Sequence, residues 1–127
     1  MANISKKILI VEDDPSFSRA LIHIIGKEGY DVISASNGLT GLRMAKEDKP
    51  DLLILDVMLP GLDGFEICNR LRHEPQTARL PIIMLSAKGQ ETDKTTGLKV
   101  GANVYLTKPV DRAVLLDNLT SLLAKAA

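Results

Sequence analysis

The chain has 127 residues, 45% of them hydrophobic and 25% charged, which is the composition of a globular protein with room for one domain, residues 1–127. Sixteen basic and sixteen acidic side chains cancel, so the sequence has no basic field that would favour direct binding of nucleic acid. The single cysteine, Cys68, excludes an internal disulfide and favours a reducing compartment. Because no apolar run could span a bilayer and no signal-peptide core is present, we expect a cytoplasmic protein without membrane insertion.

The first predicted strand, residues 8–11, is entirely apolar and ends at Glu12, Asp13 and Asp14. A helix is expected directly after it, because Asp14 suits the N-cap and a proline follows at the first helical position. The apolar residues of the next turns recur with helical spacing, which predicts an amphipathic helix. Gly29 is placed to end that helix.

The second and third predicted strands differ in composition. Residues 30–35 mix polar and apolar side chains, as an exposed edge strand does, and residues 39–45 suggest a short helix. Residues 52–55 are then four consecutive apolar residues, which is typical of a central strand buried on both faces. This strand ends at Asp56, and a carboxylate there costs free energy unless something binds it.

The second half of the chain continues the alternation of helix and strand. Asp63 and Glu66 have the spacing of a capping box, which predicts the start of a third helix. Residues 81–85 form another buried strand, and Ser86 follows it.

The last two helices differ in how strongly the sequence predicts them. Residues 90–100 contain few large apolar side chains, so a helix there would be weakly amphipathic and mostly solvent-facing. Residues 104–106 form a short strand that ends near Lys108, and Asp111 caps the final helix. Five strands therefore alternate with five helices, which predicts an α/β fold with a parallel sheet.

Chemically capable side chains follow four of these strands: Glu12 and Asp13, then Asp56, Ser86 and Lys108. Because parallel strands end at the same edge of a sheet, we expect these side chains to lie close together there. Three neighbouring carboxylates either raise a pKa or recruit a cation, and Mg²⁺ prefers such hard oxygen ligands. A carboxylate beside Mg²⁺, a lysine and a hydroxyl can accept a phosphoryl group, so Asp56 is a candidate nucleophile.

With Glu12 and Asp13, Asp56, Ser86 and Lys108 each at the end of a strand, the chain resembles, over nearly its whole length, the receiver domain of two-component response regulators, the family of the chemotaxis protein CheY. Each segment alone is a weak signal, but four in the right order at strand ends are specific. The resemblance implies a doubly wound, flavodoxin-like sheet of five parallel strands in the order 2-1-3-4-5, flanked by five helices. The four segments that carry it are Ile-Val-Glu-Asp-Asp at 10–14, Asp-Leu-Leu-Ile-Leu-Asp at 51–56 together with Met-Leu-Pro-Gly-Leu-Asp-Gly at 58–64, Pro-Ile-Ile-Met-Leu-Ser-Ala at 81–87 and Tyr-Leu-Thr-Lys-Pro at 105–109.

The resemblance implies a role for each residue at this edge. Asp56 would be the phosphoacceptor, and Mg²⁺ would be held by Glu12, Asp13, Asp56 and the backbone carbonyl of Met58. The peptide bond between Lys108 and Pro109 would be cis, although only about 5% of such bonds in folded proteins are.

The resemblance also implies how the domain would switch. Lys108 would contact the phosphoryl group and Ser86 would hydrogen-bond it, while the ring of Tyr105 would turn inward. Met58 and Lys88 occupy positions that tune the lifetime of the phosphoryl group in this family. The surface around the fourth helix, fifth strand and fifth helix would then change its affinity for partners.

The partners implied are a sensor histidine kinase or a histidine phosphotransfer protein as donor, and a downstream protein as target. The domain would be a phosphoacceptor switch that assists its own phosphorylation and dephosphorylation, rather than an enzyme acting on a separate substrate. We expect a monomer or weak dimer, and no output domain in this chain.

Two other functions need to be weighed against this one. A pseudo-receiver would use the same fold as a phosphorylation-independent interaction module, but the intact set of acids, Ser86 and Lys108 argues against it. A metal-dependent phosphohydrolase would need a general acid or base near the nucleophile, and Met58 offers none. For the remaining candidates a structural role is the better interpretation, including a buried, apolar environment for Cys68.

Overall fold

The computed structural model describes residues 5–87 and 92–126. Strands and helices alternate along these residues, in the number and order predicted from the sequence. The elements are β1 (Lys7–Val11), α1 (Pro15–Gly26), β2 (Asp31–Ala35), α2 (Gly38–Glu47), β3 (Leu52–Asp56), α3 (Gly64–Arg72), β4 (Ile82–Ser86), α4 (Thr92–Lys99), β5 (Val104–Thr107) and α5 (Arg112–Ala126).

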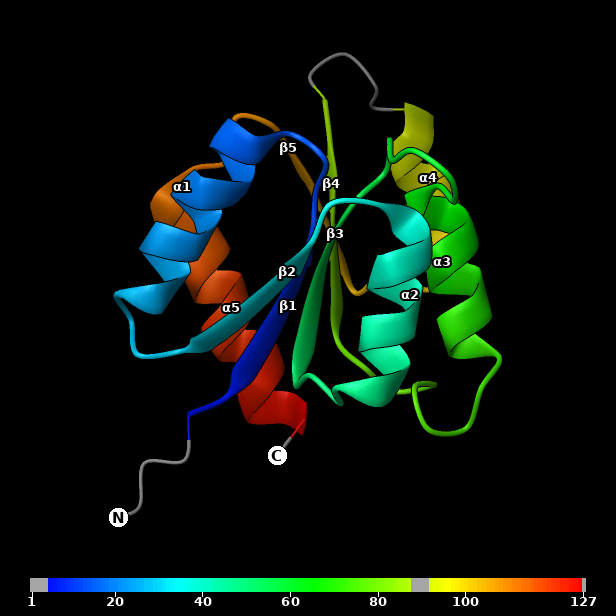
Figure 1. Ribbon diagram of the computed structural model, residues 1–127, viewed down its shortest axis with the longest axis horizontal. Coiled ribbons are helices and arrows are strands. Elements are labelled where there is room, and N and C mark those ends of the chain that lie inside the picture. Colours follow the sequence, from blue (N-terminus) through cyan, green and yellow to red (C-terminus); the bar gives the residue numbers. More distant parts are fainter. Residues whose placement is uncertain (1–4, 88–91, 127) are drawn as a thin grey trace.

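The five strands form one parallel sheet in the order β2-β1-β3-β4-β5, which confirms the predicted fold. β3 is central: Leu55 pairs with Val11 of β1 on one side and with Met84 of β4 on the other. β2 lies at an edge, as its mixed composition predicts. Helices α1 and α5 cover one face of the sheet and α2, α3 and α4 cover the other (Figure 1). Because all five strands are parallel, their carboxyl ends lie along one edge of the sheet.

The core consists of two apolar layers, one on each face of the sheet. Every residue of β3 and β4 is buried, because successive side chains point to opposite faces and both faces are covered. Leu53 and Leu55 belong to the layer under α2 and α3, whereas Leu52 and Ile54 belong to the layer under α1 and α5. The absence of polar alternation in the sequence thus reflects burial on two sides.

The predicted helix starts are largely confirmed. Ser16 N donates to Asp14 Oδ1 at 3.0 Å and Glu66 N donates to Asp63 Oδ1 at 2.9 Å, so both aspartates are N-caps. The Glu66 side chain, however, accepts a hydrogen bond from Arg70 one turn along the helix, and the expected reciprocal bond of a capping box is replaced by this pair. Residues four apart lie on the same face of a helix, so the Glu66 carboxylate can pair with the Arg70 guanidinium.

Two helix ends differ in detail from the prediction. α1 ends at Gly26, and Gly29, which we expected to end it, lies in a following turn with a φ of 94°. α4 begins at Thr92, so only the later part of the predicted helix at 90–100 can be compared. From 94 to 99 its residues are exposed except Gly97, which confirms a mostly solvent-facing helix. Lys88 lies outside the described residues.

Candidate functional site

Three carboxylates converge at the carboxyl edge of the sheet. Asp56 is the last residue of β3, and Glu12 and Asp13 directly follow the neighbouring strand β1. One carboxylate oxygen from each residue lies within 4.8 Å of the others. Glu12 and Asp56 are only 2% and 4% exposed, while Asp13 faces solvent. The sheet therefore assembles the acidic cluster that the sequence predicted.

Lys108 enters this cluster from the loop after β5. Its Nζ lies 2.8 Å from Glu12 Oε1 and 3.2 Å from Asp56 Oδ2. The Lys108 backbone N–H donates to Ser86 O at 2.7 Å, which ties the end of β5 to the end of β4. The peptide bond to Pro109 is cis, as the resemblance implied. The ammonium group is thus a cation held between two buried acids.

Burial and charge act against each other at this ion cluster. Burial is the largest influence on Glu12 and raises the pKa of its carboxyl, although Lys108 and the Asp14 amide act to lower it. Burial alone would lower the pKa of Lys108, but Glu12 and Asp56 outweigh it and the pKa is raised. The ammonium is therefore kept charged, and a proton on Glu12 is favoured relative to an exposed glutamate.

The backbone packs closely around Asp56. Met58 N lies 3.4 Å from Asp56 Oδ1, and Gly64 N donates to Val57 O at 2.9 Å. A Cβ atom on Gly64 would come within 2.4 Å of the Asp56 carbonyl oxygen. Only glycine allows this approach, so the start of α3 is held against the end of β3.

The two predicted switch residues lie on β4, which neighbours the Asp56 strand β3, and on β5, which neighbours β4. Ser86 is buried at the end of β4, and its hydroxyl donates to Ala87 O at 3.2 Å. Tyr105 pairs with Met84 in the register of β4 and β5 and is 9% exposed. Its ring is close to Gly97 of α4, where an added Cβ would lie 2.8 Å from Tyr105 Cδ2. The ring of Tyr105 in β5 therefore packs directly against Gly97 in α4.

The carboxylate cluster has the donor set of a magnesium site. Its oxygens are hard ligands, and Mg²⁺ binds through one or two carboxylates while keeping several waters. Glu12 Oε1 is buried and, beyond its ion pair with Lys108, has no well-directed hydrogen bond with the described part of the chain. A buried anionic oxygen of this kind gains from a further cation. The residues present therefore fit Mg²⁺.

Shallow hollows on both sides of Asp13 make this edge accessible. One, of about 330 Å³, runs between the start of α1 and the end of β2 and is lined by residues such as Arg19 and Ser36. The other, of about 460 Å³, lies between Asp13 and the loop after β3, which includes Met58. Met58 is 61% exposed, so its side chain stands at the rim of the site.

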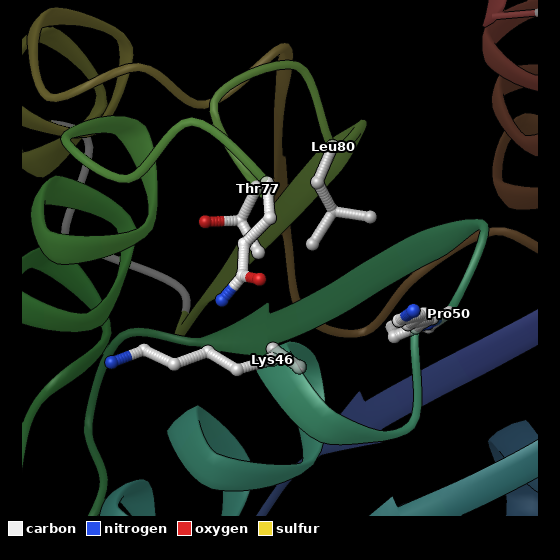
Figure 2. Close-up of a pocket in the computed structure, with 7 residues that line it drawn as sticks. Lys46, Pro50, Thr77 and Leu80 are labelled. Carbon is white, nitrogen blue, oxygen red and sulfur yellow. The ribbon is translucent and has the colours of Figure 1, made fainter.

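A further cavity, of about 320 Å³, lies at the opposite edge of the sheet, between the end of α2 and the segment before β4. Lys46 extends along its rim and away from Pro50 (Figure 2), and its ammonium lies 2.6 Å from Glu74 Oε2. Thr77 Oγ1 donates to Leu71 O at 2.6 Å. These polar groups have partners within the fold, so the chemistry is best assigned to the acidic edge.

One neighbour of the acidic cluster was not predicted from the sequence. The ring of Phe17, in the first turn of α1, lies over Lys108 Nζ, which is 4.6 Å from the ring centroid. The helical spacing indicated only that Phe17 lies on the apolar side of α1. No local signal in the sequence pairs it with a lysine on the loop after β5.

The family follows from comparison with known proteins. A family model described as the response regulator receiver domain matches residues 8–120. The chain belongs to the response regulator receiver family. It is therefore a signalling domain of the two-component type, as the resemblance implied. Among its described residues, no helix is long and apolar enough to cross a membrane.

Relatives of this receiver domain differ in length. Protein PilH of Pseudomonas aeruginosa is 41% identical over 118 residues, which cover 93% of this chain and 98% of PilH. Other relatives, mostly transcriptional regulators, are longer, and the matched segment is 26% to 53% of their length.

Solved structures share the fold closely. A Chloroflexus aurantiacus protein assigned to the response regulators has a TM-score of 0.91 at 39% identity, over 94% of this chain and 98% of that one. The receiver domain of the sensor histidine kinase PA1611 of Pseudomonas aeruginosa has a TM-score of 0.87 at 32% identity, over 94% and 98% of the two chains. That structure contains a magnesium ion coordinated in its active site cleft.

Proposed function

We propose that this receiver domain accepts a phosphoryl group on Asp56 from a phosphohistidine, with the help of Mg²⁺, and thereby changes its binding to a downstream protein. The observation that carries the proposal is the position of Asp56. Asp56 is the last residue of a buried strand, and one of its carboxylate oxygens lies within 4.8 Å of a carboxylate oxygen of Glu12 and of Asp13. Asp56 Oδ2 also lies 3.2 Å from Lys108 Nζ. That is a nucleophile with adjacent positive charge and a site for a metal.

Phosphoryl transfer would use the residues as follows. An Asp56 oxygen attacks phosphorus in line, the bond from phosphorus to the donor imidazole nitrogen breaks, and the released imidazole retains that electron pair and takes up a proton. Lys108 offsets the charge of the phosphoryl oxygens, and the Ser86 hydroxyl donates to one of them. Glu12, Asp13, Asp56 and the Met58 carbonyl would hold Mg²⁺. When bound, the ion supplies charge stabilisation to the same phosphoryl oxygens.

The proposed switch would work through Ser86 and Tyr105. A new anion at Asp56 attracts Ser86 and Lys108, whose backbones are already joined by the 2.7 Å bond between Lys108 N and Ser86 O. Tyr105 transmits a shift of these strand ends to α4, because its ring is packed beside Gly97. The affected surface is that of α4, β5 and α5. Met58 and Lys88 would tune the lifetime of the aspartyl phosphate.

The proposed donor is a sensor histidine kinase or a histidine phosphotransfer protein. Two proteins of similar structure support this pairing, since both are receiver domains of histidine kinases. The hollows beside Asp13 are open at the rim of the acidic cluster, on the side from which a donor protein would approach.

We also propose a cytoplasmic location, which the free, buried Cys68 favours, and action as a monomer or weak dimer without direct contact to nucleic acid.

The test is the intact mass of the protein after incubation with acetyl phosphate, with and without Mg²⁺. We expect the wild type to gain one phosphoryl group only with Mg²⁺, and Asp56→Asn to gain none. Asp63→Asn is a matched control, because it removes a nearby carboxylate but keeps an N-cap residue of similar quality. An unlabelled wild type, under conditions that label an established receiver, would contradict the proposal and favour a pseudo-receiver.

A further inference from the structure

The ammonium of Lys108 has a third neighbour besides its two carboxylates. Glu12 Oε1 and Asp56 Oδ2 lie 2.8 Å and 3.2 Å from Nζ, and the face of the Phe17 ring lies 4.6 Å from it, measured to the centroid. An aromatic face within about 6 Å attracts a cation through its quadrupole. Lys108 is therefore bounded by two acids and by one aromatic ring.

The position of the ring is fixed by the fold. Asp14 caps α1 directly after the acidic residues that follow β1, so the first turn of α1 starts beside the site. Phe17 is half-buried and packs against the apolar layer under α1 and α5. Lys108 reaches the ring from the loop between β5 and α5, which is held by its backbone bond to Ser86. The ring thus belongs to a different element from Glu12 and Asp56, the two carboxylates that pair with Lys108.

From this geometry we infer that Phe17 is a positioning residue that holds the Lys108 ammonium beside Asp56 for phosphoryl transfer, an inference that rests on the proposed function. Its role is distinct from that of Glu12 and Asp56. A cation bound by these two carboxylates would share the oxygens that pair with Lys108, whereas the ring contact does not depend on them. A lysine side chain has four flexible carbon–carbon bonds, so a fixed apolar and aromatic wall limits the positions that its ammonium can occupy.

A cation–π contact can be weakened without changing the size of the ring much, by replacing its hydrogens with fluorine. The test places mono-, di- or trifluorinated phenylalanine at position 17. Two readouts are compared: the order parameter of Lys108 Nζ from ¹⁵N relaxation, and the initial rate of Asp56 phosphorylation by acetyl phosphate with Mg²⁺. We expect both to fall stepwise with fluorination, with a total rate loss of about 3- to 10-fold. Phe17→Leu should show the full loss, and Phe17→Tyr should keep most of the wild-type rate.

The chain offers a matched control, because its only other phenylalanine is Phe65. Phe65 lies in α3 and packs on the opposite face of the sheet, so the same fluorinated series at position 65 should leave both readouts unchanged. If the wild type is phosphorylated but neither readout changes across the fluorinated series at position 17, this inference is overturned and the proposed function is not. That holds even if Phe17→Leu is phosphorylated slowly, because the ring would then act only by its bulk. An unlabelled wild type would overturn the proposed function and this inference with it.

Discussion

At the scale of single residues, the decisive feature is the cost of burying Glu12. Its carboxylate is almost fully buried, and Lys108 compensates for only part of the lost hydration, so its pKa is raised. A carboxyl with a raised pKa in the folded state binds its proton more tightly than in the unfolded chain. Stability is therefore greatest when Glu12 is protonated, and it is lost as the pH rises through the folded pKa. The site stores unfavourable charge that a cation can relieve.

We predict that Glu12→Gln stabilises the metal-free protein at neutral pH. Glutamine resembles the protonated glutamate in shape and carries no charge, so the variant avoids the cost of ionisation. The expected gain in the free energy of unfolding at pH 7 is about 1 kcal/mol. It should largely disappear near pH 4, below the ordinary glutamate pKa of about 4.3, because protonation then removes the charge in the folded and the unfolded chain alike. Urea denaturation in the presence of a chelator measures both values.

The control for that prediction is Glu66→Gln, which neutralises an exposed glutamate in α3. It should change the free energy of unfolding by no more than about 0.5 kcal/mol at either pH. A destabilised Glu12→Gln variant at pH 7 would show that the ion pair with Lys108 outweighs the burial of the carboxylate.

At the scale of elements, Arg72 joins the end of α3 to two loops. Its guanidinium donates to Gly101 O at 2.9 Å and to Asn103 Oδ1 at 3.0 Å, both in the segment between α4 and β5. It also donates to Thr77 O and Ala78 O, which precede β4, at 3.3 Å each. The planar fork of an arginine suits such a set of acceptors. The carboxyl end of α4 is thereby anchored to α3, away from the acidic edge.

We predict that Arg72→Gln lowers the free energy of unfolding by about 2 kcal/mol, because several backbone acceptors lose a charged donor. Arg70→Gln is the matched control on the same helix, since the Arg70 side chain is exposed and pairs with Glu66 at 3.0 Å. That variant should lose about 0.5 kcal/mol or less. Equal losses in urea denaturation would contradict an anchoring role for Arg72.

At the scale of the whole molecule, the proposed magnesium site links ligand binding to folding. The three carboxylates lie at the carboxyl ends of two strands, β1 and β3, and are brought together only by the native sheet. The unfolded chain has no equivalent cluster, so an ion that binds the cluster stabilises the folded state by mass action. The same ion relieves the charge repulsion between Glu12 and Asp56.

We predict that Mg²⁺ at about ten times its dissociation constant raises the free energy of unfolding by about 1.4 kcal/mol. Asp13→Asn and Asp56→Asn should each remove most of this increase, because each takes away an anionic ligand. Asp31→Asn serves as the control, since Asp31 is an exposed residue at the start of β2. The midpoint of urea denaturation, followed as a function of Mg²⁺ concentration, gives the result. An equal response in all four proteins would contradict the metal site.

Much of the architecture was predictable because its signals are local. Apolar runs of strand length, such as residues 52–55, report burial on both faces, and the aspartates at 14 and 63 mark helix starts through their own backbone bonds. The acidic edge also followed, because parallel strands must end together. The strand order was a different matter: it came from the resemblance to a family, since periodicity does not say which strands are neighbours.

The sequence by itself determined which elements form and which chemically capable groups follow the strands, because both depend on the order of neighbouring residues. Only the tertiary structure decided how those groups pair. The contacts of Lys108 with Glu12 and with Phe17, and those of Arg72 with the segment before β5, join residues that are far apart in the chain. They depend on the path of loops and on the direction of side chains, which the native packing fixes and local periodicity does not encode.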